Sequence, residues 1–371
     1  MEPAAESIFR QLCGNQVLFG ISFTTIINMR ALVTGPGGFL ARYIVKQLLE
    51  RGDFVRGFAR RPQPKLESAG MEMVRGDLSD ESELERACEG IDCVFHVAAI
   101  SGIGEPWSRY YQTNTVGAYN VLTAAVKQSV PYFLYTSSPS VVFGPKSLEK
   151  VDETTPYPRW YNSHYARSKA LAEQRVLEYN GRTEPSGQTL RTCSLRPHLM
   201  WGPGDEALIP RLIQRAQTGR LRQVGQANNL VDILYVENAA EAHVQAADAI
   251  QKPDSPLPGK KYFLSQGTPV NVWGWINELL ALYGEPPVSR RISFSAAYYA
   301  GAAFEAIWKL FRWVPDPPMT RFLAQQLALS FYFDISAAER DFGFRPKISK
   351  EEGMERLKQS LVETGMIPGA R

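Results

Sequence analysis

Cysteine is scarce in this chain. Cys13, Cys88, Cys93 and Cys193 are the only four among 371 residues. Their spacing fits no zinc-binding pattern, and four cysteines in a chain of this length do not indicate a disulfide framework. We therefore expect no metal site and a reducing, cytoplasmic location.

The chain also lacks a charge bias and a long apolar run. It carries 41 basic and 38 acidic residues, a net charge of +3, and no basic cluster typical of nucleic-acid binding. No stretch reaches the roughly 18 uncharged apolar residues of a membrane span. Residues 292–314 come nearest, but they include Glu305, Lys309 and Arg312. These absences argue against nucleic acid and a membrane span, and they leave a small molecule as the expected partner.

Short β-rich runs alternate with helical patterns along the first two thirds of the chain. Because strand–helix–strand alternation produces a parallel sheet covered on both faces, we expect an α/β fold. It would be a doubly wound parallel Rossmann sheet with a smaller C-terminal substrate-binding lobe over the carboxyl edge of the strands. The expected strands are residues 31–34, 54–59, 72–75, 93–98, 132–137, 192–196 and 261–265.

The expected units follow from where this alternation starts and stops. Residues 29–204 form the nucleotide-binding unit, to which 236–268 return, and residues 205–235 and 269–371 form the lobe. Residues 1–28 are an N-terminal extension, because Met29 already begins a complete first strand. We interpret the extension as an over-long gene start or a dispensable tail, with a targeting segment as the alternative.

A glycine-rich turn follows the first expected strand. Thr34-Gly35-Pro36-Gly37-Gly38-Phe39-Leu40-Ala41 joins this strand to a helix with the spacing GxxGxxA. Glycines permit the tight turn and let backbone amides approach a pyrophosphate, whose charge the helix N-terminus stabilises. We therefore expect a dinucleotide to bind at Gly35, Gly37, Gly38, Phe39 and Leu40.

The end of the second strand bears on which dinucleotide binds. Ala59 stands where an NAD-binding protein usually presents a carboxylate to the ribose 2′-hydroxyl. Arg60 and Arg61 follow, and an arginine here can bind a 2′-phosphate, although two solvated surface arginines are the alternative interpretation. The pattern favours NADP over NAD, with Arg60 as the contact.

Two further cofactor contacts are expected at strand ends. Asp77, followed by Leu78, comes directly after the third strand, where its carboxylate can meet the adenine amino group. Ala98 follows the fourth strand, where a small residue lets the backbone pass close to the cofactor. His96, just before it, is interpreted as a packing residue.

Tyr165 and Lys169 lie four residues apart, on one face of an expected helix over 164–179. A phenol is a poor base at neutral pH, but an adjacent ammonium favours its ionised form. Lys169 would thus prepare Tyr165 for proton exchange with a substrate oxygen and hold the nicotinamide ribose. Ser138 would hydrogen-bond the same oxygen, and Asn114 would hold a water that relays the proton. The combination predicts hydride transfer between a nicotinamide cofactor and an alcohol or ketone.

Neighbouring hydroxyls leave the identity of the serine open. Ser137 is the main competitor of Ser138 for this role, and Thr136 a lesser one. Pro139 follows Ser138 and restricts the local backbone, which bears on which hydroxyl faces the substrate.

These motifs resemble the extended short-chain dehydrogenase/reductase superfamily, and residues 29–365 resemble its 3β-hydroxysteroid dehydrogenase family. The resemblance is carried by TGPGGFLA at 34–41, GDLSD at 76–80, YTSSPSVVFG at 135–144, YARSK at 165–169 and LRPHLMWGPGD at 195–205. It implies that Pro197 contacts the nicotinamide end and that the protein forms a homodimer through a four-helix interface including the Tyr165 helix. The family's third glycine is Ala41 here.

Two later segments narrow the resemblance. VDILYVENAAEAH at 231–243 and PPMTRFLAQQL at 317–327 are similar to bacterial 2-alkyl-3-oxoalkanoate reductases of olefin biosynthesis. This subfamily implies NADPH-dependent reduction of a β-keto acid, with thiolase-like and synthetase enzymes as partners. The apolar aromatic set that could wall such a pocket is Phe294, Tyr298, Tyr299, Phe304, Trp308, Phe311 and Trp313, and a core-facing helix is its alternative interpretation.

We therefore expect a reductase or dehydrogenase that interconverts a bulky apolar ketone and its secondary alcohol. A 2-alkyl-3-oxoalkanoic acid is the first expected substrate, and a 3β-hydroxysteroid or C4-carboxysterol is the second. A sugar-nucleotide epimerase or dehydratase is a third candidate, because four arginines could hold a diphosphate: Arg211, Arg215, Arg220 and Arg222. A non-catalytic NADP(H) sensor is a fourth, although such proteins typically lose the Tyr or the Lys.

Overall fold

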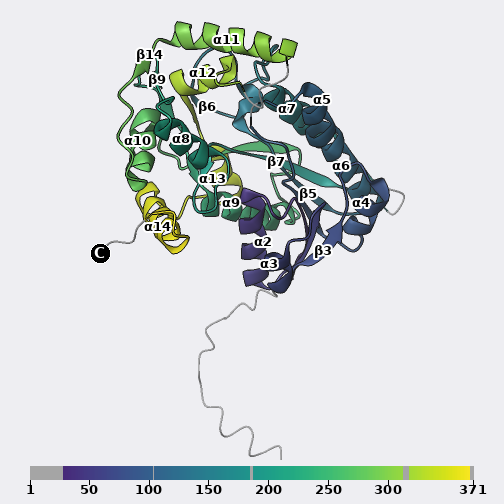
Figure 1. Ribbon diagram of the computed structural model, residues 1–371. Helices are drawn as coiled ribbons and strands as arrows, with labels where there is room; N and C mark the ends of the chain where they lie inside the picture. The colour runs from purple at the N-terminus through teal and green to yellow at the C-terminus, as the bar shows by residue number, and fades with distance from the viewer. Residues whose placement is uncertain (1–27, 103, 184–186, 312–316, 368–371) are drawn as a thin grey trace, which may run out of the picture.

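Seven parallel strands form the central sheet, in the order β12-β7-β5-β4-β1-β2-β3. The computed structural model describes residues 28–102, 104–183, 187–311 and 317–367 (Figure 1). The strands are β1 (Arg30–Thr34), β2 (Phe54–Ala59), β3 (Glu72–Arg75), β4 (Cys93–His96), β5 (Tyr132–Thr136), β7 (Arg191–Pro197) and β12 (Lys260–Leu264). All seven predicted strands are present, and the parallel sheet is confirmed. Residues 1–27 of the predicted extension, which was expected to span 1–28, lie outside the described residues, and so does Trp313.

Helices cover both faces of this sheet. The helices α2 (Phe39–Arg51) and α9 (Val236–Ile250) pack on one face, around a core that includes Val33, Ile44 and Ala246. On the other face lie α4 (Glu81–Cys88), α6 (Gly117–Lys127) and α7 (His164–Glu178), around Leu32, Val121 and others. Leu32 packs into one core and Val33 into the other, which explains why residues 31–33 of β1 are all apolar.

The fourth strand ends two residues before its predicted limit. After His96, the chain turns so that the N–H groups of Val97 and Ala98 both donate to the Thr34 hydroxyl, at 3.1 Å each. His96 is buried, and its ring bonds the same hydroxyl at 2.9 Å. Its contacts agree with the packing role expected for it.

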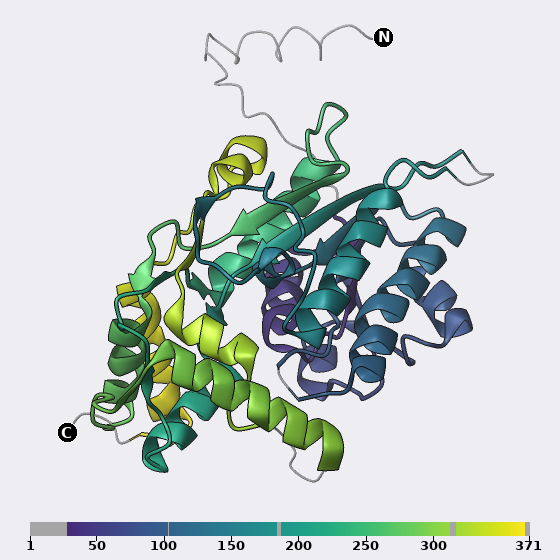
Figure 2. The same cartoon turned by 90° about the horizontal axis from the view of Figure 1, so that it is seen from above.

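A second, four-stranded sheet of order β13-β10-β15-β6 lies in the smaller lobe. Its strands are β13 (Val270–Asn271), β10 (Leu230–Val231), β15 (Phe331–Phe333) and β6 (Leu148–Val151). The lobe's main helices are α8 (Leu208–Gln217), α10 (Val272–Leu282), α11 (Phe294–Phe311), α12 (Arg321–Ala328) and α14 (Lys350–Glu363). Figure 2 shows the green and yellow lobe to one side of the sheet. Strand β6 falls in the predicted nucleotide-binding unit, 29–204, but it pairs with β15 of the predicted lobe. The division of the chain into these two units therefore stays a prediction.

Shorter elements connect these parts. They are α3 (Pro64–Ser68), α5 (Trp107–Tyr110), the π-helical turn η1 (Tyr111–Val116), the 3₁₀ turn η2 (Pro139–Val142), β8 (Met200–Trp201), β9 (Gln223–Val224), β11 (Leu234–Tyr235), β14 (Arg291–Ile292) and α13 (Ser336–Phe342). Among the residues that the structure describes, no helix has both the length and the apolar character needed to cross a membrane.

Candidate active site

The glycine turn brings β1 close to the backbone that follows β4. Gly35 has φ +67°, a left-handed conformation that favours glycine, and a Cβ atom there would lie 3.1 Å from Ala98. Its N–H donates to the Phe58 carbonyl at 2.9 Å, and the N–H of Gly38 donates to the Gly35 carbonyl at 2.9 Å. Helix α2 then begins at Phe39, after a residue that has no side chain to cap it. The amides of its first turn therefore fit a pyrophosphate.

Arginines and one carboxylate surround the position expected for the adenosine ribose. Arg60, Arg75, Gly76 and Asp77 line a hollow of about 390 Å³. The Asp77 carboxylate accepts the N–H and the hydroxyl of Ser79 at 3.0 and 2.8 Å, which lowers its pKa. Its Oδ2 lies 3.9 Å from Arg60 Nε.

Sequence reasoning missed Arg75. In the structure, Arg75 on β3 pairs directly with Ala59 on β2. The signal that could have found it is a cation at the last position of the third strand. Arg61, in contrast, is not among the residues that line the hollow.

Tyr165 stands in the first turn of α7, which Ser163 caps by accepting the N–H of Ala166 at 3.3 Å. Burial raises the pKa of the Tyr165 phenol, and a hydrogen bond with Ser138 opposes that rise. The Ser138 hydroxyl also lies 2.9 Å from the Ser140 hydroxyl and accepts the N–H of Ser140 at 3.2 Å. The structure thus brings Tyr165 together with the serine that the sequence favoured.

Lys169 is fully enclosed one turn later on α7, at 2% exposure. Its ammonium donates to the Thr136 carbonyl at 2.5 Å and lies 4.2 Å from the centre of the Tyr135 ring. Burial lowers the pKa of Lys169 to about 7, against the opposing charge of Glu173. The expected lowering of the Tyr165 pKa is therefore wrong for this state, since burial decides the direction and Lys169 points to Thr136.

Asn114 is buried in the π-helical turn η1, a type of distortion that often occurs at functional sites. Its Oδ1 accepts the N–H of Ile100 at 2.7 Å, and its Nδ2 donates to the Ile100 carbonyl and the Ser168 hydroxyl at 3.0 Å each. These bonds join the loop after β4 to α7. The proton relay through Asn114 stays a prediction.

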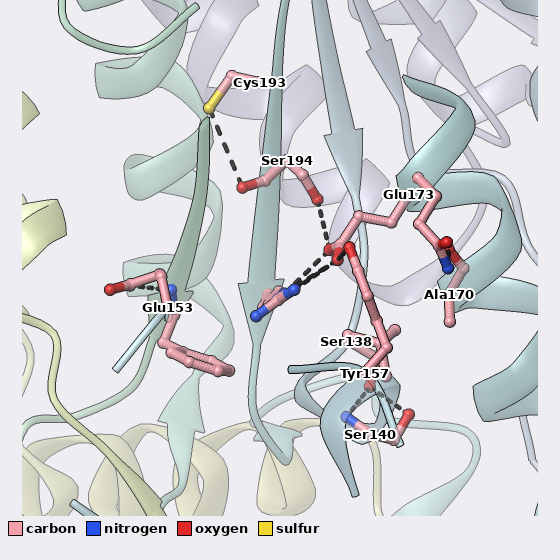
Figure 3. A network of polar contacts seen from close by, with 12 residues as sticks. Ser138, Ser140, Glu153, Tyr157, Ala170, Glu173, Cys193 and Ser194 are labelled. Carbon is pink, nitrogen blue, oxygen red and sulfur yellow. Dashed lines mark hydrogen bonds and ion pairs between the residues drawn. The ribbon is translucent and has the colours of Figure 1, made fainter. Parts of the chain in front are cut away.

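A buried ion pair joins α7 to β7 behind these groups. Arg196 Nη2 donates to Glu173 Oε1 at 2.5 Å, and both side chains are 0% exposed. The hydroxyls of Tyr157 and Ser194 donate to the same carboxylate at 2.6 and 2.8 Å, as Figure 3 shows. Burial raises the pKa of Glu173, but Arg196 and these hydrogen bonds outweigh it and hold the pKa at about 2. Sequence reasoning missed this pair, although Glu173 follows Lys169 by one turn.

One cavity of about 1360 Å³ contains the predicted site. Apart from Asn114, every predicted cofactor and catalytic residue lines it, from the glycine turn to Ser138, Tyr165, Lys169 and Pro197. The cavity continues along an apolar face of α12 formed by Phe322, Leu323 and Leu327.

The expectation that aromatic residues of α11 wall this cavity is wrong for the members whose side chains are described. Phe294, Tyr298, Tyr299, Phe304 and Trp308 are not among its lining residues, because α12 lies between α11 and the cavity. Trp313 lies outside the described residues, and so does the side chain of Phe311.

A parallel sheet with a glycine turn after β1, and a cavity reaching from that turn to Tyr165 and Lys169, are the features of an NAD(P)-dependent oxidoreductase. Residues 32–294 match the 3-beta hydroxysteroid dehydrogenase/isomerase family. The chain belongs to this family, and the predicted extended short-chain dehydrogenase/reductase fold and oxidoreductase class are confirmed.

Its curated relatives span nearly the whole chain. Proteins named 2-alkyl-3-oxoalkanoate reductase from Shewanella oneidensis and Stenotrophomonas maltophilia are each 42% identical to it. The alignments cover 89% of this chain and 86% of the first relative, and 90% of this chain and 99% of the second. A 3-beta-hydroxysteroid dehydrogenase from Mycolicibacterium neoaurum is 33% identical, over 92% of this chain and 94% of the relative.

Solved structures share the fold at lower identity. A dTDP-glucose 4,6-dehydratase from Streptomyces venezuelae with NAD bound has a TM-score of 0.69 at 23% identity, covering 90% of this chain and 97% of that chain. A UDP-glucuronic acid 4-epimerase from Bacillus cereus in complex with NAD has a TM-score of 0.67 at 19% identity, covering 91% of this chain and 99% of that chain. These likenesses establish the fold alone.

Proposed function

We propose that this protein reduces a 2-alkyl-3-oxoalkanoic acid to the corresponding 3-hydroxy acid with NADPH. The observation that carries the proposal is the single cavity, which runs from the glycine turn past Tyr165 and Ser138 to an apolar wall on α12. Such a wall suits long alkyl chains. The two relatives at 42% identity carry the name of this activity.

Each catalytic group has a defined task in this proposal. NADPH, when bound, supplies the hydride. The Tyr165 phenol, whose raised pKa keeps it protonated at neutral pH, donates a proton to the ketone oxygen. The Ser138 hydroxyl donates a hydrogen bond to the same oxygen and orients the carbonyl. Lys169 holds the nicotinamide ribose, and Asn114 relays the proton outward through a water.

The preference for NADPH over NADH rests on Arg60 and Arg75 beside Ala59. Two guanidinium groups at one ribose favour a phosphate, and no carboxylate occupies position 59 to accept a 2′-hydroxyl. We expect Arg60→Ala to weaken NADPH binding by at least about tenfold and NADH binding by less than about threefold. Equal losses of affinity for NADPH and NADH would refute this assignment. Arg61→Ala is the matched control, because Arg61 does not line the hollow and its removal should leave both affinities unchanged.

The test of the activity is oxidation of a racemic long-chain 2-alkyl-3-hydroxy acid with NADP⁺, followed by nicotinamide absorbance. Turnover that Tyr165→Phe lowers by at least about 10³-fold, with cofactor binding retained, supports the proposal. Absence of turnover on the acid, together with activity on a 3β-hydroxysteroid or a C4-carboxysterol, would move the substrate to the sterol class.

Separate tests address an epimerase or dehydratase and a cofactor sensor. Arg211 and Arg215 also line the cavity, so a UDP-sugar is included as a substrate for an epimerase or dehydratase. A sensor that binds NADP(H) without turnover would keep its physiological function in the Tyr165→Phe variant.

We also propose a homodimer in a reducing, cytoplasmic setting, with olefin-pathway enzymes as partners. Exposed apolar side chains on the adjacent helices α6 and α7, Tyr119 at 42% and Leu171 at 36%, support a helical interface. The buried, unpaired cysteines Cys88, Cys93 and Cys193 suit a reducing compartment. Light scattering of the purified protein tests the dimer.

A further inference from the structure

His198 has an unpaired ring nitrogen beside the reaction centre. The residue follows Pro197 at the end of β7 and is 6% exposed. Its backbone N–H donates to the Leu264 carbonyl at 3.0 Å, and its ring packs edge-on against Phe143 and Phe333, with centroids 5.9 and 5.3 Å away. It lines the cavity, and its Nδ1 is buried with no hydrogen-bond partner among the described residues.

The state of this ring follows from its surroundings. Burial lowers the pKa of His198 to about 3, although a hydrogen bond to the backbone of Asp232 favours the charged form. Since Nδ1 has no partner, the proton lies on Nε2 in that bond, and Nδ1 is an acceptor. Asp232, whose backbone bonds the ring, also carries a titratable side chain. Burial raises the pKa of its carboxyl to about 6, and its carboxylate accepts the Phe333 N–H at 2.8 Å.

Gln326 supplies a donor to the same region. It lines the cavity from α12, one turn after Phe322, which packs in the aromatic cluster that holds Phe143 and Phe333. Its Nε2 is buried and has no hydrogen-bond partner in the described part of the chain. The residues that line the cavity therefore include one with an unpaired acceptor, His198, and one with an unpaired donor, Gln326.

A carboxylic acid complements such a pair, because it has one O–H donor and one carbonyl acceptor. Buried polar groups are nearly always paired in proteins, so an unpaired one in a residue that lines a cavity is a position where a ligand group can supply the missing partner. The position also fits. Strands β5 and β7 pair Thr136 with Leu195, which places His198 at the same sheet edge as Ser138. In a 3-oxo acid, the carboxyl carbon is only two bonds from the reacting ketone carbon.

We propose that His198 and Gln326 are the receptor for the carboxyl group of the substrate. The acid binds in its neutral form, with its O–H donated to His198 Nδ1 and its carbonyl accepting from Gln326 Nε2. This inference rests on the proposed function and names the group by which the same site selects its substrate. Because a free carboxylic acid is ionised at neutral pH, one proton is taken up from water on binding.

The test compares a 2-alkyl-3-hydroxy acid with its methyl ester, both oxidised with NADP⁺. The ester keeps the reacting alcohol and the alkyl chains but has no O–H to donate to His198. We expect His198→Leu and Gln326→Met each to raise KM for the acid by at least about tenfold while kcat changes less than about threefold. KM for the ester should change less than about threefold in both variants.

Two controls separate recognition from structural damage. His198→Asn keeps an acceptor near the position of Nδ1 and should recover most of the affinity for the acid. Unchanged NADPH affinity, measured by fluorescence quenching, shows that each variant is folded, and Gln326→Met provides the measurement if His198→Leu does not fold. In the wild-type enzyme, KM for the acid should rise by about tenfold for each pH unit above about pH 5, where the free acid is ionised, while KM for the ester stays constant.

Distinct results would overturn the inference and the proposed function. Equal changes for acid and ester in His198→Leu, or a KM for the acid that is independent of pH, would refute the carboxyl receptor and leave the reductase assignment intact. Failure of the wild-type enzyme to oxidise either compound would refute the proposed function, and the inference with it.

Discussion

Replacing Glu173 by Gln removes the charge that balances Arg196 inside the molecule. The carboxylate accepts bonds from Arg196, Tyr157 and Ser194 at 2.5 to 3.2 Å, and neither charged side chain reaches solvent. A carboxyl whose pKa falls from 4.5 to about 2 on folding contributes about 3 kcal/mol, at about 1.4 kcal/mol per pKa unit. Breaking a buried pair costs about 3–5 kcal/mol, because the remaining charge stays uncompensated. We expect Glu173→Gln to lower the free energy of unfolding by about 3–4 kcal/mol.

Urea unfolding at neutral pH measures this loss, and a double-mutant cycle isolates the interaction between the two charges. Arg196→Met in the Glu173→Gln background should recover at least about half of the loss, because no unpaired charge remains. A loss below about 1 kcal/mol, or additive effects in the cycle, would refute the reasoning.

The pH dependence provides an independent check on Glu173. The folded-state pKa is lower than the unfolded one, so the stabilisation is complete above about pH 4.5 and is lost as the pH falls towards about 2. The wild-type protein should lose about 3 kcal/mol more than Glu173→Gln across this range.

The remaining predictions concern other buried contacts. Lys169→Met should abolish turnover but raise the free energy of unfolding by about 4 kcal/mol at pH 7, because it removes the cost of burying a charge whose pKa falls from 10.5 to about 7, at about 1.4 kcal/mol per pKa unit. In the wild-type protein, stability should rise between about pH 7 and pH 10.5, where the unfolded chain binds more protons than the folded one, and this rise should be absent from the variant. Unchanged stability of Lys169→Met would contradict that account. Gly35→Ala should cost about 1–3 kcal/mol and weaken dinucleotide binding, because its φ is +67° and the new Cβ lies 3.1 Å from Ala98. Gly301→Ala should raise KM for the substrate without changing NADPH affinity, because its Cβ would lie 2.6 Å from the Thr320 backbone and push α12 away from α11. Calorimetry and binding titrations check both glycine variants against Gly144→Ala, where a new Cβ meets nothing within 4 Å. Wild-type behaviour of Gly35→Ala or Gly301→Ala would refute these two predictions.

The sequence by itself determined the central sheet and predicted the part of the cavity lining that runs from the glycine turn to Tyr165 and Lys169. Alternation of apolar runs with helical spacing predicted all seven strands of the main sheet, because strand and helix periods are local properties of the chain. The glycine turn and the spacing of Tyr165 and Lys169 are local as well. Position at the carboxyl end of parallel strands was then enough to bring Ser138, Asp77 and Ala98 to one edge.

Only the tertiary structure decided what surrounds these residues. The pairs Ala59 with Arg75 and Glu173 with Arg196 are separated by 16 residues or more in the chain, so no local pattern reports their contact. The same is true of β6, which pairs with a strand more than 180 residues later. Burial also set the direction of the Tyr165 and Lys169 pKa values, because the cost of enclosing a charge depends on every group packed around it and not on its neighbours in sequence.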